Sequence, residues 1–82
     1  MRTEFSERLK IAMNLRGVTA YAIGRDTSVS KQSTMGYLKG RSPLIKAVIT
    51  LSEYLSVGLM WLATGTGNME KNSNPGVGSP NN

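Results

Sequence analysis

The apolar residues of this chain recur at the spacing of a helix, and nowhere do they alternate with polar residues over the length of a strand. The clearest stripe, at positions 0, +3, +4, +7 and +11, consists of Leu44, Ala47, Val48, Leu51 and Leu55. A second stripe, at i, i+4, i+7 and i+8, consists of Phe5, Leu9, Ala12 and Met13. Because such stripes mark the buried face of an amphipathic helix, the sequence predicts an all-α fold.

Signals for helix starts and ends divide the first 67 residues into five short helices. We predict helices over about 4–16, 20–26, 31–39, 43–55 and 59–63. Side chains that can accept hydrogen bonds from the first N–H groups mark four of the starts, at Thr3, Thr19, Ser30 and Ser42, the last directly before Pro43. Gly17 and Gly40 can adopt the left-handed conformation that ends a helix. The expected architecture is a compact five-helix domain.

The chain is long enough for one small domain. Its 82 residues have a mass of 8.9 kDa, and a chain of this size buries about 60% of the surface that its unfolded form exposes. After Gly67 the sequence becomes rich in Asn, Ser, Gly and Pro and has little apolar content. We therefore expect a folded domain over residues 1–67 and a flexible, disordered C-terminal tail or interdomain linker over residues 68–82.

The residue inventory argues against an enzyme. Cysteine and histidine are both absent, which excludes disulfide bonds, thiolate metal sites, Ser-His-Asp catalysis and the commonest zinc ligand. The five carboxylates have no metal-ligand spacing. We expect no metal, no cofactor and no small-molecule substrate. Apolar runs fall far short of the roughly 18 residues that a membrane span needs, so we expect no membrane insertion and a cytoplasmic location.

The excess of basic residues points to an anionic partner. Ten Lys and Arg residues against five Asp and Glu residues give a formal net charge of +5, and the pI is about 10.0. Nucleic acids and anionic membrane surfaces attract such a chain. Residues 25–46 contain one anion, Asp26, and five cations, which are Arg25, Lys31, Lys39, Arg41 and Lys46. Five cations less one anion leave +4 of the charge in this segment.

The segment from residue 19 to residue 40 has the pattern of two short helices that cross. About three residues join the helices, a geometry typical of a helix-turn-helix. The small Gly24 would let the second helix approach the first, and Ser28 followed by Val29 suits the turn. Three residues of the second helix would then point back into the core, namely Thr34 through its methyl group, Tyr37 and Leu38.

The run from Ile23-Gly24 through Ser28-Val29-Ser30 to Tyr37-Leu38-Lys39-Gly40 resembles the helix-turn-helix of lambda-repressor-like (Cro/C1-type) regulators. The later segment Trp61-Leu62-Ala63-Thr64-Gly65-Thr66-Gly67 is similar to the ending of DNA-binding domains of temperate-phage repressors. The family usually has alanine where Gly24 stands and glycine where Ser28 stands. We therefore expect a slightly reshaped turn, in which Ser28 adopts the turn conformation at some cost.

The resemblance implies a sequence-specific double-stranded DNA-binding protein, a phage-type transcriptional repressor acting in a bacterial host cell. Its second motif helix, about 31–39, would lie in the major groove of a pseudo-palindromic operator. The positions that would face the bases are Lys31, Gln32, Ser33, Gly36 and Lys39. Lysine can donate to guanine and glutamine can pair with adenine. The candidates for phosphate contact are Thr19, Ser30, Arg41 and Lys46.

Some apolar residues lie beside the main stripe of the fourth helix and beyond it. These residues are Ile45, Ile49, Val57 and Leu59. Exposed apolar residues suggest a partner surface, and members of the family that this chain resembles bind paired half-sites as dimers. We therefore expect a homodimer on DNA through these four residues, with a wider buried face as the alternative.

Two other functions are compatible with the same scaffold. An antitoxin-type DNA-binding autoregulator would use its C-terminal tail to wrap a toxin, but the tail here has almost no apolar anchors for coupled folding. A protein-interaction module would use the helix-turn-helix only as a surface, since a fold does not fix a function. Salt dependence separates the module from a DNA-binding protein, because phosphate contacts weaken steeply as salt rises.

Overall fold

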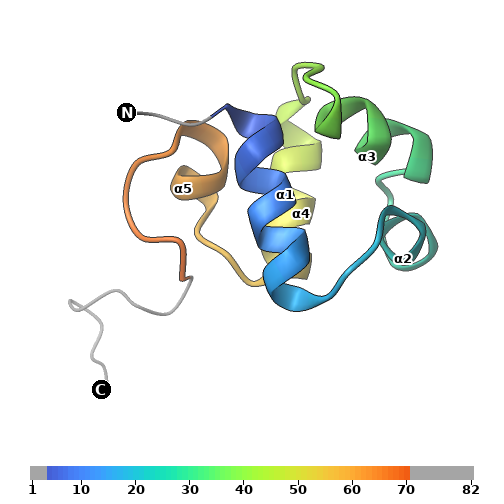
Figure 1. The fold of residues 1–82 in the computed structure, drawn as a ribbon, viewed down its shortest axis with the longest axis horizontal. Coiled ribbons are helices and arrows are strands. Elements are labelled where there is room, and N and C mark those ends of the chain that lie inside the picture. The colour runs from blue at the N-terminus through green and yellow to red at the C-terminus, as the bar shows by residue number, and fades with distance from the viewer. Residues whose placement is uncertain (1–3, 71–82) are drawn as a thin grey trace.

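A computed structural model of the protein describes residues 4–70, and residues 1–3 and 71–82 lie outside the described part. Its helices are α1 (Phe5–Arg16), α2 (Ala20–Asp26), α3 (Lys31–Leu38), α4 (Ile45–Leu55) and α5 (Leu59–Thr64) (Figure 1). Within residues 4–70 the β-type pairing is limited to an isolated antiparallel bridge between Val57 and Glu70. The prediction of a compact, all-α domain of five helices is confirmed.

Helix α1 lies at the centre of the domain and packs against α3, α4 and α5. Figure 1 shows α1 alongside α4, with α5 to one side and the α2–α3 pair to the other. The buried apolar side chains are Leu9, Ala12, Met13, Ile23, Val29, Tyr37, Ala47, Val48, Leu51, Leu55, Val57 and Leu62. Both predicted stripes contribute to this core, and every helix supplies at least one of its residues. The motif helices are thereby fixed to a single core.

Most of the predicted helix ends use the local chemistry that the sequence indicates. Gly17 follows α1 with φ 67°, in the left-handed region. The side-chain oxygens of Thr19 and Ser30 accept hydrogen bonds from backbone N–H groups at the starts of α2 and α3. Three boundaries differ by one residue: α1 begins at Phe5 rather than at Glu4, α3 ends at Leu38 rather than at Lys39, and α5 ends at Thr64 rather than at Ala63. Helix ends fray over such a distance. The predicted cap Thr3 lies outside the described residues.

The predicted start of the fourth helix is wrong. Residues 41–44 are not helical, α4 begins at Ile45, and the extended Leu44 precedes it without a side-chain cap, so Ser42 and Pro43 do not start the helix. A residue outside a helix can span up to about 3.3 Å against 1.5 Å in a helix, which lets this short segment connect the end of α3 to α4. As a consequence Leu44 is 72% exposed and does not belong to the core stripe.

The chain after α5 turns back onto the domain. The N–H of Gly58 donates to the carbonyl of Met69 at 2.8 Å, and the Met69 side chain packs against the core. Glu70 pairs with Val57 through the bridge and with Arg16 through a 3.2 Å ion pair. Packing therefore extends to Glu70, three residues beyond the predicted domain end at 67. The rest of the predicted tail, residues 71–82, lies outside the described residues.

Two arginines of α1 bind the carbonyl ends of other helices. The buried Arg8 guanidinium donates to the carbonyls of Leu62 at 3.0 Å and Ala63 at 3.1 Å, at the end of α5. Arg16 donates to the carbonyls of Leu55 at 2.7 Å and Ser56 at 3.0 Å, at the end of α4. Because the last carbonyls of a helix have no partner within it, these arginines satisfy them and fix both helices to α1.

Candidate nucleic-acid interface

Helices α2 and α3 form a helix-turn-helix in which Gly24 is the point of closest approach. A Cβ added to Gly24 would lie 2.8 Å from the backbone nitrogen of Lys31, too close for any side chain without a shift of the backbone. The prediction that a small residue is required here is confirmed. Ile23, on the same helix, is fully buried and anchors α2 to the core.

The turn between the two helices is built without a glycine. Ser56 is the sole non-glycine residue with positive φ in the part of the chain that the structure describes, so Ser28 does not adopt a left-handed conformation and the predicted cost at Ser28 is absent. Thr27 organises the turn instead. Its hydroxyl donates to the carbonyl of Ile23 at 2.8 Å and accepts from the N–H of Val29 at 3.0 Å. This role of Thr27 was not predicted from the sequence, although threonine is a typical residue of such side-chain turns.

One face of α3 faces the core and the opposite face is exposed. Thr34 and Tyr37 are buried, as predicted, and the Thr34 hydroxyl donates to the carbonyl of Ser30 at 3.0 Å. Among the predicted base-contacting residues, Lys31, Gln32 and Lys39 are exposed, whereas Ser33 and Gly36 are partly buried. The structure therefore gathers all five on or beside the outer side of α3.

The outer face of α3 contains one residue that was not predicted from the sequence. Met35 is 41% exposed, and it lies three residues after Gln32 and four before Lys39, which puts the three side chains next to each other on the helix surface. The helical spacing alone was sufficient to find it. An exposed methionine offers apolar contact of the kind that a thymine methyl group accepts.

The hydroxyl groups at the start of α3 are linked to each other. The Ser30 side chain accepts from the N–H of Ser33 and donates to the Ser33 hydroxyl, both at 3.0 Å. Its hydrogen-bonding capacity is therefore largely used inside the motif, which orients Ser33 and leaves the Ser33 hydroxyl hydrogen able to donate outward. Thr19, at the start of α2, accepts from the N–H of Ala22 at 3.1 Å and is exposed.

Arg41 lies against α3 instead of extending away from it. Its backbone N–H donates to the carbonyl of Gly36 at 3.0 Å, and its guanidinium carbon is 5.3 Å from the centre of the Tyr37 ring. A Cβ added to Gly36 would lie 3.3 Å from that same guanidinium carbon. The bare backbone of Gly36 thus provides the space that the Arg41 side chain occupies.

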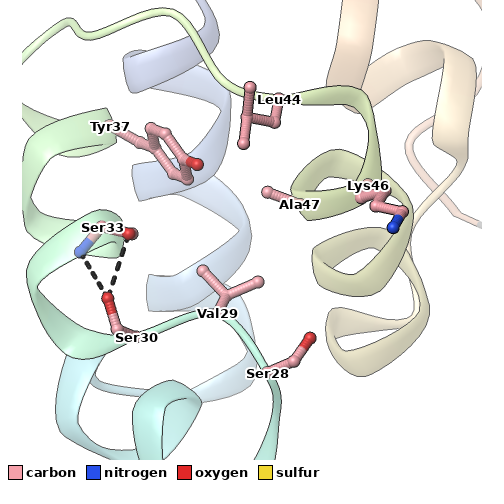
Figure 2. Close-up of a pocket in the computed structure, with 8 residues that line it drawn as sticks. All are labelled: Ser28, Val29, Ser30, Ser33, Tyr37, Leu44, Lys46 and Ala47. Carbon is pink, nitrogen blue, oxygen red and sulfur yellow. Dashed lines mark hydrogen bonds between the residues drawn. The ribbon is translucent and has the colours of Figure 1, made fainter.

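A hollow of about 270 Å³ separates α3 from the start of α4 (Figure 2). Its lining consists of Ser28, Val29, Ser30, Ser33, Tyr37, Leu44, Lys46 and Ala47. The Tyr37 ring points from α3 across the hollow toward α4. Tyr37 is 3% exposed, and no hydrogen bond joins its hydroxyl to another described residue. The hollow therefore combines an apolar interior with hydroxyl groups and one amine at its edge.

The positive charge of the motif is concentrated around α3. Arg25 is paired with Asp26, which removes this pair from the net charge of the segment. No ion pair within residues 4–70 involves the remaining four cations, which are Lys31, Lys39, Arg41 and Lys46. All four are exposed. Since Arg8 and Arg16 bind carbonyl groups within the domain, the basic surface is narrower than the composition suggests and borders α3.

The Arg25–Asp26 pair also connects the motif to α4. Arg25 binds both oxygens of Asp26, at 2.9 and 3.1 Å, and the Tyr54 hydroxyl donates to Asp26 at 2.6 Å. The hydrogen bonds from Arg25 and then from Tyr54 lower the pKa of Asp26 to about 2. The hydrogen bond to Asp26 raises the pKa of the Tyr54 phenol. Asp26 therefore stays ionised and fixes the end of α2.

The four residues predicted for a dimer interface do not share one environment. Ile45 is 65% exposed, and Ile49 and Leu59 are each 40% exposed. Val57 is fully buried, so its prediction as an interface residue is wrong. The reason is the return of the chain after α5, because Glu70 pairs with the backbone of Val57 and the Val57 side chain belongs to the core.

Known proteins provide an independent comparison. No family model matches the chain, and no solved structure matches it significantly. The chain is 37% identical, over 62 residues and 76% of its length, to the HTH-type transcriptional regulator for conjugative element R391 of Providencia rettgeri. The regulators for conjugative elements SXT of Vibrio cholerae and pMERPH of Shewanella putrefaciens match to the same extent. Over these 62 residues the chain is therefore distantly similar to part of the HTH-type transcriptional regulators. It spans 29% of the length of these relatives.

The homology agrees with the predicted class of protein. The HTH-type relatives are described as regulators and not as enzymes, as expected from the residue inventory. No three potential metal-ligating side chains gather anywhere in residues 4–70. None of the helices in that range has the length and apolar content to cross a membrane. The relatives belong to conjugative elements, whereas the resemblance of the motifs pointed to phage repressors.

Proposed function

We propose that this chain binds double-stranded DNA with sequence specificity and acts as a transcriptional repressor of the temperate-phage type in the bacterial cytoplasm. Helix α3 enters the major groove of a pseudo-palindromic operator. The observation that carries the proposal is the exposed face of α3, which presents hydrogen-bonding side chains between cations that have no ion-pair partner within the described residues. The homology to HTH-type transcriptional regulators supports it.

The base contacts are assigned to the outer side of α3. Lys31 donates to guanine, and Gln32 pairs with the two adenine groups in the major groove. Ser33, oriented by Ser30, donates its free hydroxyl hydrogen. Lys39 reaches the groove from the end of the helix, and Gly36 adds no side chain of its own to the middle of this face. Each good bidentate base contact discriminates by about 1–3 kcal/mol.

The phosphate contacts are assigned to both sides of α3. Thr19 at the start of α2 donates its hydroxyl to one strand, and Lys46 in the first turn of α4 contacts the other. The hollow between α3 and α4, with its hydroxyl groups and the Tyr37 phenol, seats the sugar–phosphate edge beside Lys46. Ser30 contributes through the N-terminus of α3, since its side chain is engaged with Ser33.

A homodimer would place two copies of α3 on the paired half-sites. The proposed interface consists of the exposed Ile45, Ile49 and Leu59, without Val57. Two-fold symmetry of the protein then matches the symmetry of the operator, with half-site centres about 34–36 Å, or one helical turn, apart.

The direct test is selection of the full chain on random DNA duplexes, followed by titration of the selected sequence at several salt concentrations. We expect an inverted repeat and a log–log salt slope of about −0.9 for each phosphate contacted. Selection of no sequence together with a slope near zero would exclude the proposal.

Substitution of Gln32 tests the assignment of a base-reading residue. Gln32→Ala should reduce discrimination at one base pair by about 5- to 150-fold, which corresponds to 1–3 kcal/mol, while binding to scrambled DNA changes little. Lys10→Ala is the matched control, because Lys10 is exposed on α1 outside the proposed interface. Equal losses on selected and scrambled duplexes would show that Gln32 does not read a base.

A further inference from the structure

The side chain of Arg41 is held on the face of α3 by the turn that follows the helix. Gly40 has φ 111°, a conformation that favours glycine, and its N–H donates to the carbonyl of Tyr37 at 3.0 Å. The next N–H, of Arg41, donates to the carbonyl of Gly36. These two bonds turn the chain back on the helix end, so that Arg41 returns beside residues 36 and 37.

Two features fix the guanidinium there. The Tyr37 ring lies below it at 5.3 Å, within the range of a cation–π contact. Gly36 lies beside it without a side chain, and a Cβ at Gly36 would approach the guanidinium carbon to 3.3 Å and Nε to 3.4 Å. A glycine inside a helix usually costs about 1 kcal/mol relative to alanine. At Gly36 the Arg41 side chain occupies the space that a side chain of residue 36 would need.

The guanidinium N–H groups of Arg41 nevertheless have no hydrogen-bond acceptor among the described residues. Arg41 is exposed, and no ion pair or side-chain hydrogen bond connects it to another described residue. A guanidinium has five N–H donors in a rigid plane, and stacking on an aromatic ring limits the orientations of that plane. The donors of Arg41 are therefore pre-oriented and available to a ligand.

We propose that Arg41 reads a base, a guanine through its O6 and N7 atoms, although it lies outside the recognition helix. The inference rests on the proposed function and deepens it, because it revises the sequence-based assignment of Arg41 to a phosphate. A phosphate contact requires only a cation at the edge of the groove and gains nothing from a bare Gly36. The guanidinium of Arg41 is planar, is held in place beside Gly36 and lies about one helical turn from Gln32. This arrangement suits bidentate recognition of guanine. Arg41 supplies the side chain that Gly36 lacks.

The test compares base preferences of the full chain with those of Arg41→Lys, Arg41→Ala and Gly36→Ala, by selection on random duplexes and by salt titration. Arg41→Lys keeps the charge but loses the fork. We expect it to lose about 5- to 150-fold discrimination for guanine at one base pair of each half-site, with the salt slope unchanged. Gly36→Ala should weaken the preference at the same base pair, because its methyl group displaces the guanidinium. Lys10→Ala should alter neither quantity.

Three results would overturn the inference in distinguishable ways. If Arg41→Lys keeps the full preference of the unaltered chain, Arg41 does not read a base. If Arg41→Ala weakens binding to selected and scrambled duplexes equally and makes the log–log salt slope shallower by about 0.9, Arg41 contacts a phosphate. If the unaltered chain selects no sequence, the proposed function fails and the inference fails with it. Thermal unfolding of each variant shows that it is folded, which is expected because Arg41 is exposed.

Discussion

Replacement of the buried Arg8 by methionine should destabilise the domain strongly. Arg8 is 4% exposed and donates to the carbonyls of Leu62 and Ala63 at 3.0 and 3.1 Å. Hydrogen bonds from charged groups contribute about 1.5–3 kcal/mol each. Methionine retains most of the aliphatic stem but leaves both carbonyls without these donors, and the one on the fully buried Leu62 is the harder to hydrate. Because the buried charge is removed as well, we expect a net loss of about 2–4 kcal/mol.

That loss is large for this protein. A domain of this size has a free energy of unfolding of about 3–10 kcal/mol, and each kcal/mol shifts Tm by about 4–8 °C. Arg8→Met should therefore lower Tm by about 10–30 °C, measured by circular dichroism, with a matching fall in the urea midpoint. Lys10→Met is the matched control: Lys10 is exposed on the same helix, and its substitution should change stability by less than about 0.5 kcal/mol. A loss below about 1 kcal/mol for Arg8→Met would refute the reasoning.

Three further variants test the helix crossing in the motif, the loss of stability at acid pH and the dimer interface. Gly24→Ala should cost about 1 kcal/mol in urea unfolding, because its Cβ would lie 2.8 Å from the Lys31 nitrogen and overpacking outweighs the gain in helix propensity; greater stability would contradict this. The hydrogen bond from Arg25 lowers the pKa of Asp26 from 3.8 to about 2, so ionised Asp26 stabilises the fold fully above pH 3.8 and loses this effect as the pH falls toward 2. The Tm of Asp26→Asn should therefore vary less between pH 5 and pH 2 than the Tm of the unaltered chain. Parallel curves of Tm against pH for the two proteins would be evidence against this role of Asp26. Ile45→Asp should retain binding to one half-site but lose cooperative binding to two, seen by sedimentation on DNA; unchanged cooperativity would remove Ile45 from the interface.

Much of the helical organisation could be predicted because its signals are local. Thr19 and Ser30 cap the helices that they precede, and Gly17 ends α1 in the left-handed conformation. Gly24 could be assigned to a close helix crossing because it lies in the first of two short helices that only about three residues join. In each case the relevant physical contact lies within a few residues of the signal.

Pro43 shows why a local signal can mislead. The fixed φ of proline, near −65°, suits the first residue of a helix and equally suits extended chain. The sequence alone does not distinguish these two outcomes, since the choice depends on the distance between the end of α3 and the start of α4. In the structure Pro43 lies outside the helix, and Leu44, which is extended, is exposed.

The remaining errors concern contacts between residues far apart in the chain. The composition includes Arg8 in the positive net charge, but its side chain is buried and binds carbonyls 54 and 55 residues away. From the sequence Val57 is one apolar residue more than the helix stripes need, but the return of the chain to pair Glu70 with Val57 places it in the core. Tertiary packing decided these two cases, and no pattern of nearby residues contains it.

The most direct test of the central claim is to follow backbone amide shifts of the ¹⁵N-labelled chain during titration with the selected duplex. We predict that the largest changes fall on the exposed side of α3, at Lys31, Gln32 and Gly36, and extend to Lys46, while the amides of α5 change little. Largest changes on α5, or no changes at duplex concentrations above that of the protein, would contradict the claim that α3 is the DNA-binding element.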